Sequence, residues 1–225
     1  MTNTEEEKTN EKIKKNTSKK NIGIMGGTFD PIHYGHLVTA ETVYDAFDIE
    51  KILFIPTGSP AHKCVTLGTN HRLEMTKLAV RNNEKFEIST IEIDRGGKTY
   101  TVDTIEELTT QLEDDTTFYF IMGADSIHQL EQWKDTKRLL SLCEFIGVTR
   151  PGYDKKGVEE AVAKLNEAYG AKIHFLEVPA LDISSSDIRD RIEHGTSIRY
   201  LLPDDVLAYI HKFQLYSDKE GGIPS

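Results

Sequence analysis

The chain has 225 residues and a formal net charge of -10 at pH 7. This acidic balance disfavours a nonspecific DNA or RNA binder, because such proteins gain most of their affinity by neutralising phosphates with Lys and Arg. Its apolar content of 38% is that of an ordinary globular domain. The longest apolar runs, such as residues 52–56, fall far short of the roughly 20 residues that cross a membrane.

Residues 1–20 contain neither an apolar stretch nor a small-residue cleavage site, so they do not resemble a secretory signal. We expect a disordered tail at 1–20, one domain over 21–216 and a short tail at 217–225. Cys64 and Cys143 are far apart in the sequence and form no CxxC pair, so neither a disulfide framework nor a zinc site is indicated. A cytoplasmic location fits these features.

Short β-rich runs alternate with segments of helical period between the two tails. We predict strands over 21–25, 51–55, 86–93, 117–122, 144–149 and 172–177. We predict amphipathic helices over 36–47, 71–81, 102–112, 158–169, 186–194 and 203–213. Such repeated strand–helix–strand units predict an α/β fold, a doubly wound Rossmann-like parallel sheet flanked by helices in a single domain. Ligands of these sheets bind at the carboxyl ends of the strands.

The first motif, GGTFDPIHYGH at residues 26–36, follows the first predicted strand. Its glycines allow close approach of a ligand, and Asp-Pro supplies a turn. We expect a helix to begin near Gly35, with its amide groups and positive dipole end facing an anion. His33 and His36 could reach the same phosphate, because imidazole donates hydrogen bonds and adds charge when it is protonated.

Other interpretations of this motif stay open. The glycines could form only a tight turn, and the histidines could be capping or surface residues. A metal site made by Asp30, His33 and His36 would need a fourth ligand that the sequence does not suggest. The motif is neither the GxGxxG dinucleotide fingerprint nor the GxxxxGK[ST] loop, so dehydrogenases and P-loop proteins lose their main support.

The second motif, ISSSDIRDRI at residues 183–192, follows the last predicted strand. Its serines offer hydroxyls and free amide groups at a helix start, where a polyphosphate could bind. Arg189 on the next turn could hold a phosphate in bidentate fashion and absorb charge that develops on a pyrophosphate leaving group. The alternative is a well-capped helix with Arg189 on its solvated face.

Together, GGTFDPIHYGH and ISSSDIR resemble the signatures of the HxGH nucleotidyltransferase superfamily. A fuller resemblance over residues 21–216 is to the bacterial nicotinate-nucleotide adenylyltransferase family, and it includes KTYTVDT at 98–104, MGADS at 122–126 and Trp133. That family joins nicotinic acid mononucleotide to AMP from ATP and releases deamido-NAD and pyrophosphate. The resemblance implies this step of NAD biosynthesis, Mg²⁺ with ATP as co-substrate, and no nucleic-acid or membrane partner. A homodimer is one candidate assembly.

The resemblance also implies roles for individual residues. The catalytic residues would be His33, His36 and Arg189. The ATP site would contain Gly26, Gly27, Thr28, Phe29, Lys63, Asp125, Arg150, Ile183, Ser184, Ser185 and Ser186, the last standing where the family commonly has Thr. Nicotinic acid mononucleotide would be held by Tyr100, Thr101, Trp133 and Lys134, and no residue is expected to bind a metal directly. Trp133 could equally be a core aromatic, Asp125 a helix N-cap and Lys63 a solvated loop charge.

We expect the acceptor's own phosphate oxygen to attack the α-phosphorus of ATP in line, without a general base, because a phosphate monoester is already ionised. Two other functions stay open. Phosphopantetheine adenylyltransferases share both signatures but are generally shorter and lack the KTYTVDT and GADS combination, and cytidylyltransferases are more distant. A noncatalytic nucleotide-binding regulator would be expected to have lost a signature histidine or Arg189, and these are present.

Overall fold

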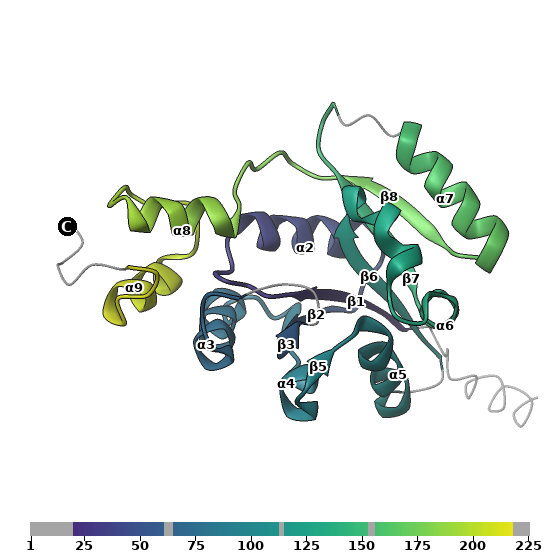
Figure 1. Cartoon of the computed structure of the whole chain (residues 1–225), viewed down its shortest axis with the longest axis horizontal. Helices are drawn as coiled ribbons and strands as arrows, with labels where there is room; N and C mark the ends of the chain where they lie inside the picture. Colours follow the sequence, from purple (N-terminus) through teal and green to yellow (C-terminus); the bar gives the residue numbers. More distant parts are fainter. Residues whose placement is uncertain (1–19, 61–64, 113–114, 153–155, 218–225) are drawn as a thin grey trace, which may run out of the picture.

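The structure, a computed structural model, describes residues 20–60, 65–112, 115–152 and 156–217. At its centre six strands form a sheet in the order β4-β2-β1-β6-β7-β8, and each neighbouring pair is parallel (Figure 1). The strands are β1 (Lys20–Gly27), β2 (Lys51–Pro56), β4 (Phe86–Ile88), β6 (Thr116–Gly123), β7 (Glu144–Thr149) and β8 (Ile173–Glu177). This is the strand order of a doubly wound Rossmann-like sheet, so the predicted fold class is confirmed.

Helices cover both faces of the sheet. They are α2 (Tyr34–Ala46), α3 (Thr69–Val80), α4 (Ile91–Arg95), α5 (Thr101–Gln111), the 3₁₀ helix η2 (Ala124–Gln132), α6 (Thr136–Leu142), α7 (Lys156–Tyr169), α8 (Ser185–Glu193) and α9 (Asp204–Lys212). Strand side chains alternate between the faces. Leu53 and Ile55 therefore join a core cluster with α5, α6 and α7, while Ile52 and Phe54 join a second cluster with α2, α3, α8 and α9. Because helices bury both faces of the sheet, a ligand can reach the sheet only at the ends of its strands.

The strand order reverses between β1 and β6, the two central strands of the sheet. The chain leaves β1 through α2, whose buried side chains belong to the second core cluster, and it leaves β6 through η2, whose buried side chains belong to the first. These two connections therefore turn to opposite faces, and a crevice opens between them. The fold places the binding crevice at the carboxyl ends of β1 and β6.

The predicted strands and helices are mostly confirmed, with ends shifted by a few residues. The strand predicted over 86–93 is wrong in its second half, because β4 ends at Ile88 and α4 follows. Both Ile93 and Asp94 donate their backbone N–H groups to the carbonyl of Thr90, each over 2.8 Å, which winds this segment into a helical turn. The helices η2 and α6 were not predicted, nor was the short parallel pair β3 (Ser59–Pro60) and β5 (Lys98–Thr99). The predicted tails lie almost wholly outside the described residues.

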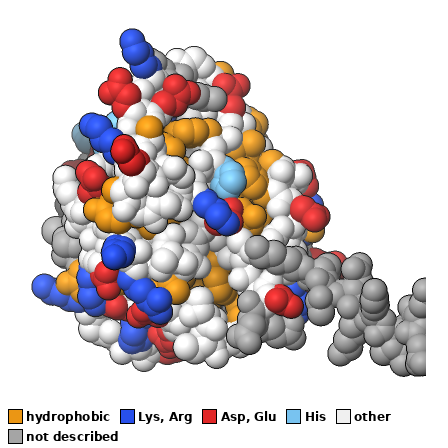
Figure 2. Space-filling model, turned by 90° about the vertical axis from the view of Figure 1, so that its right-hand side faces the viewer, with side chains coloured by type: hydrophobic (Ala, Val, Ile, Leu, Met, Phe, Trp, Pro, Cys, Tyr) orange, Lys and Arg blue, Asp and Glu red, His pale blue; other side chains and the backbone are white. Residues whose placement is uncertain are grey.

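The surface carries both signs of charge. On the face shown in Figure 2, blue Lys and Arg side chains are interspersed with red Asp and Glu side chains and with small hydrophobic areas. The coloured side chains of that face form no broad basic patch of the kind that follows a nucleic-acid backbone. None of the helices in the described ranges is both long enough and apolar enough to cross a bilayer.

Candidate active site

Two cavities open at the carboxyl ends of the central strands, where the strand order reverses. The first has a volume of about 590 Å³ and the second of about 490 Å³, both within the range of small-ligand sites. Gly26 at the end of β1 and Ile121, Met122 and Gly123 at the end of β6 line both. The two cavities therefore lie side by side and share a wall.

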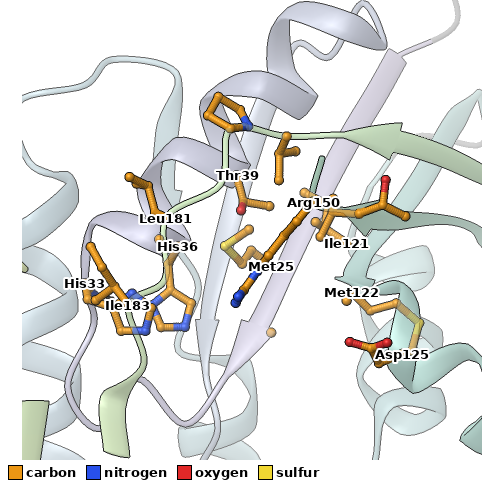
Figure 3. Close-up of a pocket in the computed structure, with 17 residues that line it drawn as sticks. Met25, His33, His36, Thr39, Ile121, Met122, Asp125, Arg150, Leu181 and Ile183 are labelled. Atoms are coloured by element: carbon orange, nitrogen blue, oxygen red, sulfur yellow. Dashed lines mark hydrogen bonds between the residues drawn. The ribbon is translucent and has the colours of Figure 1, made fainter. Parts of the chain in front are cut away.

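The first cavity collects predicted residues from distant parts of the chain (Figure 3). Its lining includes Gly26, His33, His36, Asp125, Arg150 and Ile183. They come from the end of β1, the start of α2, the residues directly after β6 and β7, and the segment that precedes α8. The structure thus gathers into one cavity six of the residues predicted to bind ATP or to act in catalysis.

The two histidines stack on each other at the start of α2, with ring centroids 3.8 Å apart. The backbone N–H of His33, the residue before the helix, donates to Nδ1 of His36 over 3.3 Å. Because Nδ1 accepts this hydrogen bond, we assign the proton of neutral His36 to Nε2. The ring of Phe29 supports His36 edge-on, with ring centroids 5.1 Å apart. His36 therefore has a fixed tautomer and a supported orientation, and its ring faces the cavity (Figure 3).

The side chain of Phe29, which was predicted to belong to the ATP site, is not among the residues that line these two cavities. The ring is only 1% exposed, and its other neighbour is the core residue Phe54, at 5.9 Å between ring centroids. The backbone of Phe29 has a positive φ of 48°, which turns the chain at this point. Its apolar ring lies in the second core cluster. Phe29 thus acts on the site through His36.

Gly35 is needed between the two histidines because no side chain fits there. A Cβ built at this position would lie 2.9 Å from both Cε1 and Nδ1 of the His33 ring. Any larger residue would have to displace that buried imidazole. The helix itself begins one residue earlier than predicted, at Tyr34.

The imidazole of His33 is neutral in the ligand-free protein at neutral pH. His33 is only 6% exposed, and its Nδ1 has no hydrogen-bond partner among the described residues. Burial lowers the pKa of His33 from 6.5 to about 4, because a charged ring would lose its hydration. The charged contact with a phosphate that the sequence suggested is therefore not preformed. It would require the uptake of a proton when an anion binds.

The lowered pKa of His33 predicts how stability depends on pH. Between pH 6.5 and about 4 the unfolded chain binds a proton at this histidine that the folded chain does not, so the free energy of unfolding falls as the pH falls. From pH 7 to pH 5 this contributes about 2 kcal/mol, at roughly 1.4 kcal/mol per pKa unit. We expect His33→Asn to lose this part of the slope in urea unfolding measured at each pH. The variant His128→Asn, at an exposed histidine, is the matched control, and equal slopes for wild type and His33→Asn would contradict the prediction.

In Figure 3, Asp125 lies across the first cavity from the histidines, and the side chain of Arg150 extends from the end of β7 toward them. Asp125 is in the first turn of η2, whose N-cap is Gly123, so Asp125 is not the helix cap that was the alternative. Arg150 pairs with Asp182 over 3.0 Å, and both side chains are exposed. Exposed ion pairs are weak, so this guanidinium can exchange its carboxylate for a phosphate at small cost. The cavity is therefore lined by a carboxylate, an adjustable cation and two imidazoles.

The second motif is bonded directly to the first. Ser185 Oγ donates to the carbonyl of Pro31 over 2.8 Å, and Arg189 Nη1 donates to the carbonyl of Asp30 over 2.8 Å. These bonds join residues more than 150 positions apart in the sequence. The start of α8 therefore lies against the turn that leads to the two histidines, and the structure brings the two motifs together as predicted.

The remaining side chains of the second motif take part in building α8. Ser184 is its N-cap, and Ser184 Oγ accepts the backbone N–H of Asp187 over 3.1 Å. Ser186 Oγ accepts a hydrogen bond from Arg189 Nη2 over 3.3 Å. Neither the three serines nor Arg189 are among the residues that line the two cavities. The capped-helix interpretation is thus correct for Ser184, and of this motif Ile183 is the residue that lines the first of these two cavities.

The second cavity collects the residues predicted to hold the acceptor. Its lining includes all four of them, Tyr100, Thr101, Trp133 and Lys134, and also Gly27 and Thr28, which were predicted to belong to the ATP site. Thr101 is the first residue of α5 and Tyr100 is its N-cap, so the start of α5 opens onto the cavity. The N–H groups of a first helical turn have no partner within the helix and attract an anion. The cavity is therefore suited to a ligand with a carboxylate.

Trp133 has both of the roles that the sequence left open. Its ring packs edge-on against Phe120, with centroids 5.9 Å apart, and adjoins the first core cluster. It also lines the second cavity. Next to it, Lys134 donates to both carboxylate oxygens of Asp103 over 2.8 Å and lies 4.7 Å from the ring centroid of Tyr100. The rim of this cavity thus combines aromatic rings with a cation.

Glu92 also lines the second cavity and was not predicted. Its side chain is buried, and Glu92 Oε1 accepts the hydroxyl of Thr104 over 2.8 Å. Burial raises the pKa of the Glu92 carboxyl. Nothing in the sequence distinguishes this glutamate from the solvated charges around it, since the pattern of its segment predicts a strand. Lys63, which was predicted to bind ATP, lies outside the described residues.

The resemblance of the two motifs implies Mg²⁺ with ATP. In the described part of the chain, however, His, Cys, Asp and Glu side chains form no group of three or more that could hold one. Mg²⁺ usually keeps several waters and binds through one or two carboxylates together with substrate phosphates. Among the residues that line the first cavity, Asp125 is the carboxylate that could take part in such a site.

Comparison with known proteins assigns this chain to a family. The profile of cytidylyltransferase-like proteins matches residues 24–191. The "Probable nicotinate-nucleotide adenylyltransferase" of Thermoanaerobacter sp. (strain X514) is 49% identical over 205 residues, which cover 90% of this chain and 97% of that protein. The protein of the same name in Desulfitobacterium hafniense (strain Y51) is 48% identical over 89% of this chain and 98% of its own length. The chain belongs to the nicotinate-nucleotide adenylyltransferase family.

A solved structure has the same fold as this chain. Plasmodium falciparum nicotinic acid mononucleotide adenylyltransferase complexed with NaAD matches 88% of this chain and 97% of its own, with a TM-score of 0.71 and 24% identity. At this identity the likeness concerns the fold alone. The resemblance seen in the two motifs is thus confirmed by relatives over nearly the whole chain, and the chain is a nucleotidyltransferase of the nicotinate-nucleotide adenylyltransferase family.

Proposed function

We propose that the chain transfers AMP from ATP to nicotinic acid mononucleotide, giving deamido-NAD and pyrophosphate in NAD biosynthesis. Two adjacent cavities that share Gly26 and Gly123 support this proposal above all. The product is a dinucleotide, and its two halves would occupy one cavity each. With ATP in the first cavity and the acceptor in the second, the reacting phosphates would meet at the shared wall, where glycines leave room for them.

In this arrangement a phosphate oxygen of the acceptor attacks the α-phosphorus of ATP. A new P–O bond forms as the bond from that phosphorus to the bridging oxygen breaks, and the electron pair leaves with pyrophosphate. The attacking phosphate is already ionised, so no side chain has to remove a proton. Catalysis then depends on orientation and on stabilising charge. The Nε2–H of His36 would donate to the phosphates, and Arg189 would stabilise the leaving group from the side of α8.

The other residues of the first cavity would bind ATP. The carboxylate of Asp125 would accept a hydrogen bond from a ribose hydroxyl, and Arg150 would leave its exposed partner for the triphosphate. Mg²⁺ is the proposed metal ion, and when bound with ATP it neutralises charge on the phosphate oxygens. Because these contacts come from β6, β7 and α2, they would fix the nucleotide between the two halves of the sheet.

The start of α5 would distinguish the acid from the amide form of the acceptor. Backbone N–H groups near Thr101 can donate hydrogen bonds to a carboxylate. The NH₂ group of a nicotinamide is itself a donor, so it could not accept these hydrogen bonds. We expect kcat/KM for nicotinic acid mononucleotide to exceed that for nicotinamide mononucleotide by at least ~10-fold, measured as pyrophosphate release from ATP and Mg²⁺. Equal efficiencies would remove the proposed selectivity.

The same assay tests the proposed function against its alternatives. With phosphopantetheine as acceptor we expect no release of pyrophosphate above the rate without acceptor. Activity with phosphopantetheine alone would replace the proposed acceptor, and ATP binding without turnover of any acceptor would favour a noncatalytic regulator.

We also propose a cytoplasmic location, which fits the free, buried thiol of Cys143. We further propose a homodimer, for which sedimentation equilibrium is the test.

A further inference from the structure

Asp30 is a buried carboxylate in the turn of the first motif, and it is bonded to two other parts of the chain. It is 3% exposed. Its Oδ2 accepts the backbone N–H of Thr66 over 2.6 Å, and its Oδ1 accepts the phenolic hydroxyl of Tyr216 over 2.8 Å. Tyr216 follows α9, close to the end of the described residues. One side chain of the turn therefore joins the loop before α3 to the C-terminal segment.

The backbone of the same turn is held by two arginines. Arg189 Nη1 donates to the carbonyl of Asp30 over 2.8 Å. Arg72, which is fully buried, donates to the carbonyls of Thr28 over 2.7 Å and Gly58 over 3.1 Å. These contacts hold the turn from several sides at once.

The charges around Tyr216 keep its hydroxyl a donor. Burial, followed by the neighbouring negative charge of Asp30, raises the pKa of the Tyr216 phenol, and the positive charges of Arg189 and Arg72 oppose this only in part. The phenol is therefore protonated at neutral pH and donates to a carboxylate. Hydrogen bonds to a charged acceptor are among the stronger ones in proteins.

We propose that Tyr216 is a positioning residue for adenylyl transfer, which acts through Asp30 to fix the turn between β1 and α2. That turn presents the Asp30 carbonyl to Arg189, carries the ring of Phe29 beneath His36, and leads into His33 at the helix start. Loss of the Tyr216 bond would let these groups shift together. Small displacements of groups that orient a reaction lower its rate strongly. The inference rests on the proposed function for its kinetic part alone.

Tyr216→Phe tests this, with Tyr209→Phe as the matched control. Tyr209 lies on α9, and its hydroxyl is 3.0 Å from Nδ1 of His71, so each variant removes one phenolic hydrogen bond from the same end of the chain. We expect Tyr216→Phe to lower kcat by about 10-fold with a change in KM of less than about 3-fold. We expect Tyr209→Phe to keep the wild-type kcat. Equal kinetics for the two variants would overturn the proposal.

A double-mutant cycle separates positioning from a general loss of stability. If Tyr216 acts through the turn that Arg189 contacts, Tyr216→Phe should lower kcat much less in the Arg189→Ala background than in the wild type. Fully additive effects would contradict this. All variants are assayed well below their own Tm, and Asp30→Asn, which retains one carbonyl acceptor, serves if Tyr216→Phe does not fold.

The ligand-free protein provides a readout that is independent of activity. We expect the imidazole NMR signals of His33 and His36 to shift in Tyr216→Phe and to stay in place in Tyr209→Phe, which should instead shift those of His71. If the wild type shows no transfer to any acceptor but these shifts occur, the proposed function fails and the control of the turn by Tyr216 stands. Unchanged His33 and His36 signals in Tyr216→Phe would refute the inference whatever the activity.

Discussion

His36→Ala should lower kcat by about 10²-fold or more, the scale seen when one preorganised hydrogen-bond donor is removed. Nδ1 of His36 accepts the backbone N–H of His33, so Nε2 carries the proton that can be donated to a phosphate. The ring is held in place by Phe29 at 5.1 Å and by the stacked ring of His33 at 3.8 Å. The donor thus needs no reorientation when ATP binds. Single-turnover measurement of pyrophosphate release would show the loss in the chemical step.

A second variant separates the phosphate donor from the helix start. His36→Ala also removes the acceptor for the His33 N–H, so part of its effect could come from a weakened start of α2. His36→Asn retains a side-chain oxygen at this third helical position, which can accept that N–H, but it lacks a donor at the place of Nε2. We expect both variants to lose turnover to a similar extent, and His36→Asn to retain more of the wild-type Tm. Wild-type turnover in a clean His36→Ala preparation would exclude the proposed role.

The fold was predictable from the sequence because its evidence is local. Apolar runs such as those over β2 and β6, separated by segments of helical period, indicate parallel pairing without knowledge of distant contacts. The alternation failed at Ile91–Arg95, where isoleucines separated by an acidic residue fit a strand as well as the helical turn that formed. The two motifs likewise located the carboxyl end of β1 and the start of α8. The glycines and Asp-Pro of the first motif mark its turn in the sequence itself.

The remainder of the site depends on contacts between residues far apart in the sequence. The bond between Asp30 and Tyr216 spans 186 positions, and Arg72 is buried although its type is mostly exposed. The sequence likewise contains nothing to show that Phe29 would face the core or that Glu92 would line a cavity. Periodicity assigns a residue to a face of its own element. It does not identify the distant segment that will cover that face.

Arg189→Ala should also lower kcat by ~10²-fold or more, because the guanidinium would lose two functions at once. It has five N–H donors, and the described residues Asp30 and Ser186 accept two of them. The others could hold the pyrophosphate as it leaves, while the bond to the Asp30 carbonyl keeps the turn in place. Arg191→Ala is the matched control, since Arg191 lies on the same helix but pairs with Asp187 over 2.8 Å. We expect that control to retain wild-type kcat.

Arg189→Lys decides which of the two functions of Arg189 matters more. Lysine keeps the positive charge as a single compact group and lacks the planar fork, so it can reach either the Asp30 carbonyl or a phosphate but not both in the same geometry. If Arg189 acts mainly by its charge on the leaving group, Arg189→Lys should recover most of the activity that Arg189→Ala loses. If the fork must bridge turn and phosphate, Arg189→Lys should stay close to Arg189→Ala in kcat, and we expect this second result because Nη1 is already committed to the turn. Wild-type kcat in Arg189→Ala would place the arginine outside the reaction and leave the bond between α8 and the turn as its one role.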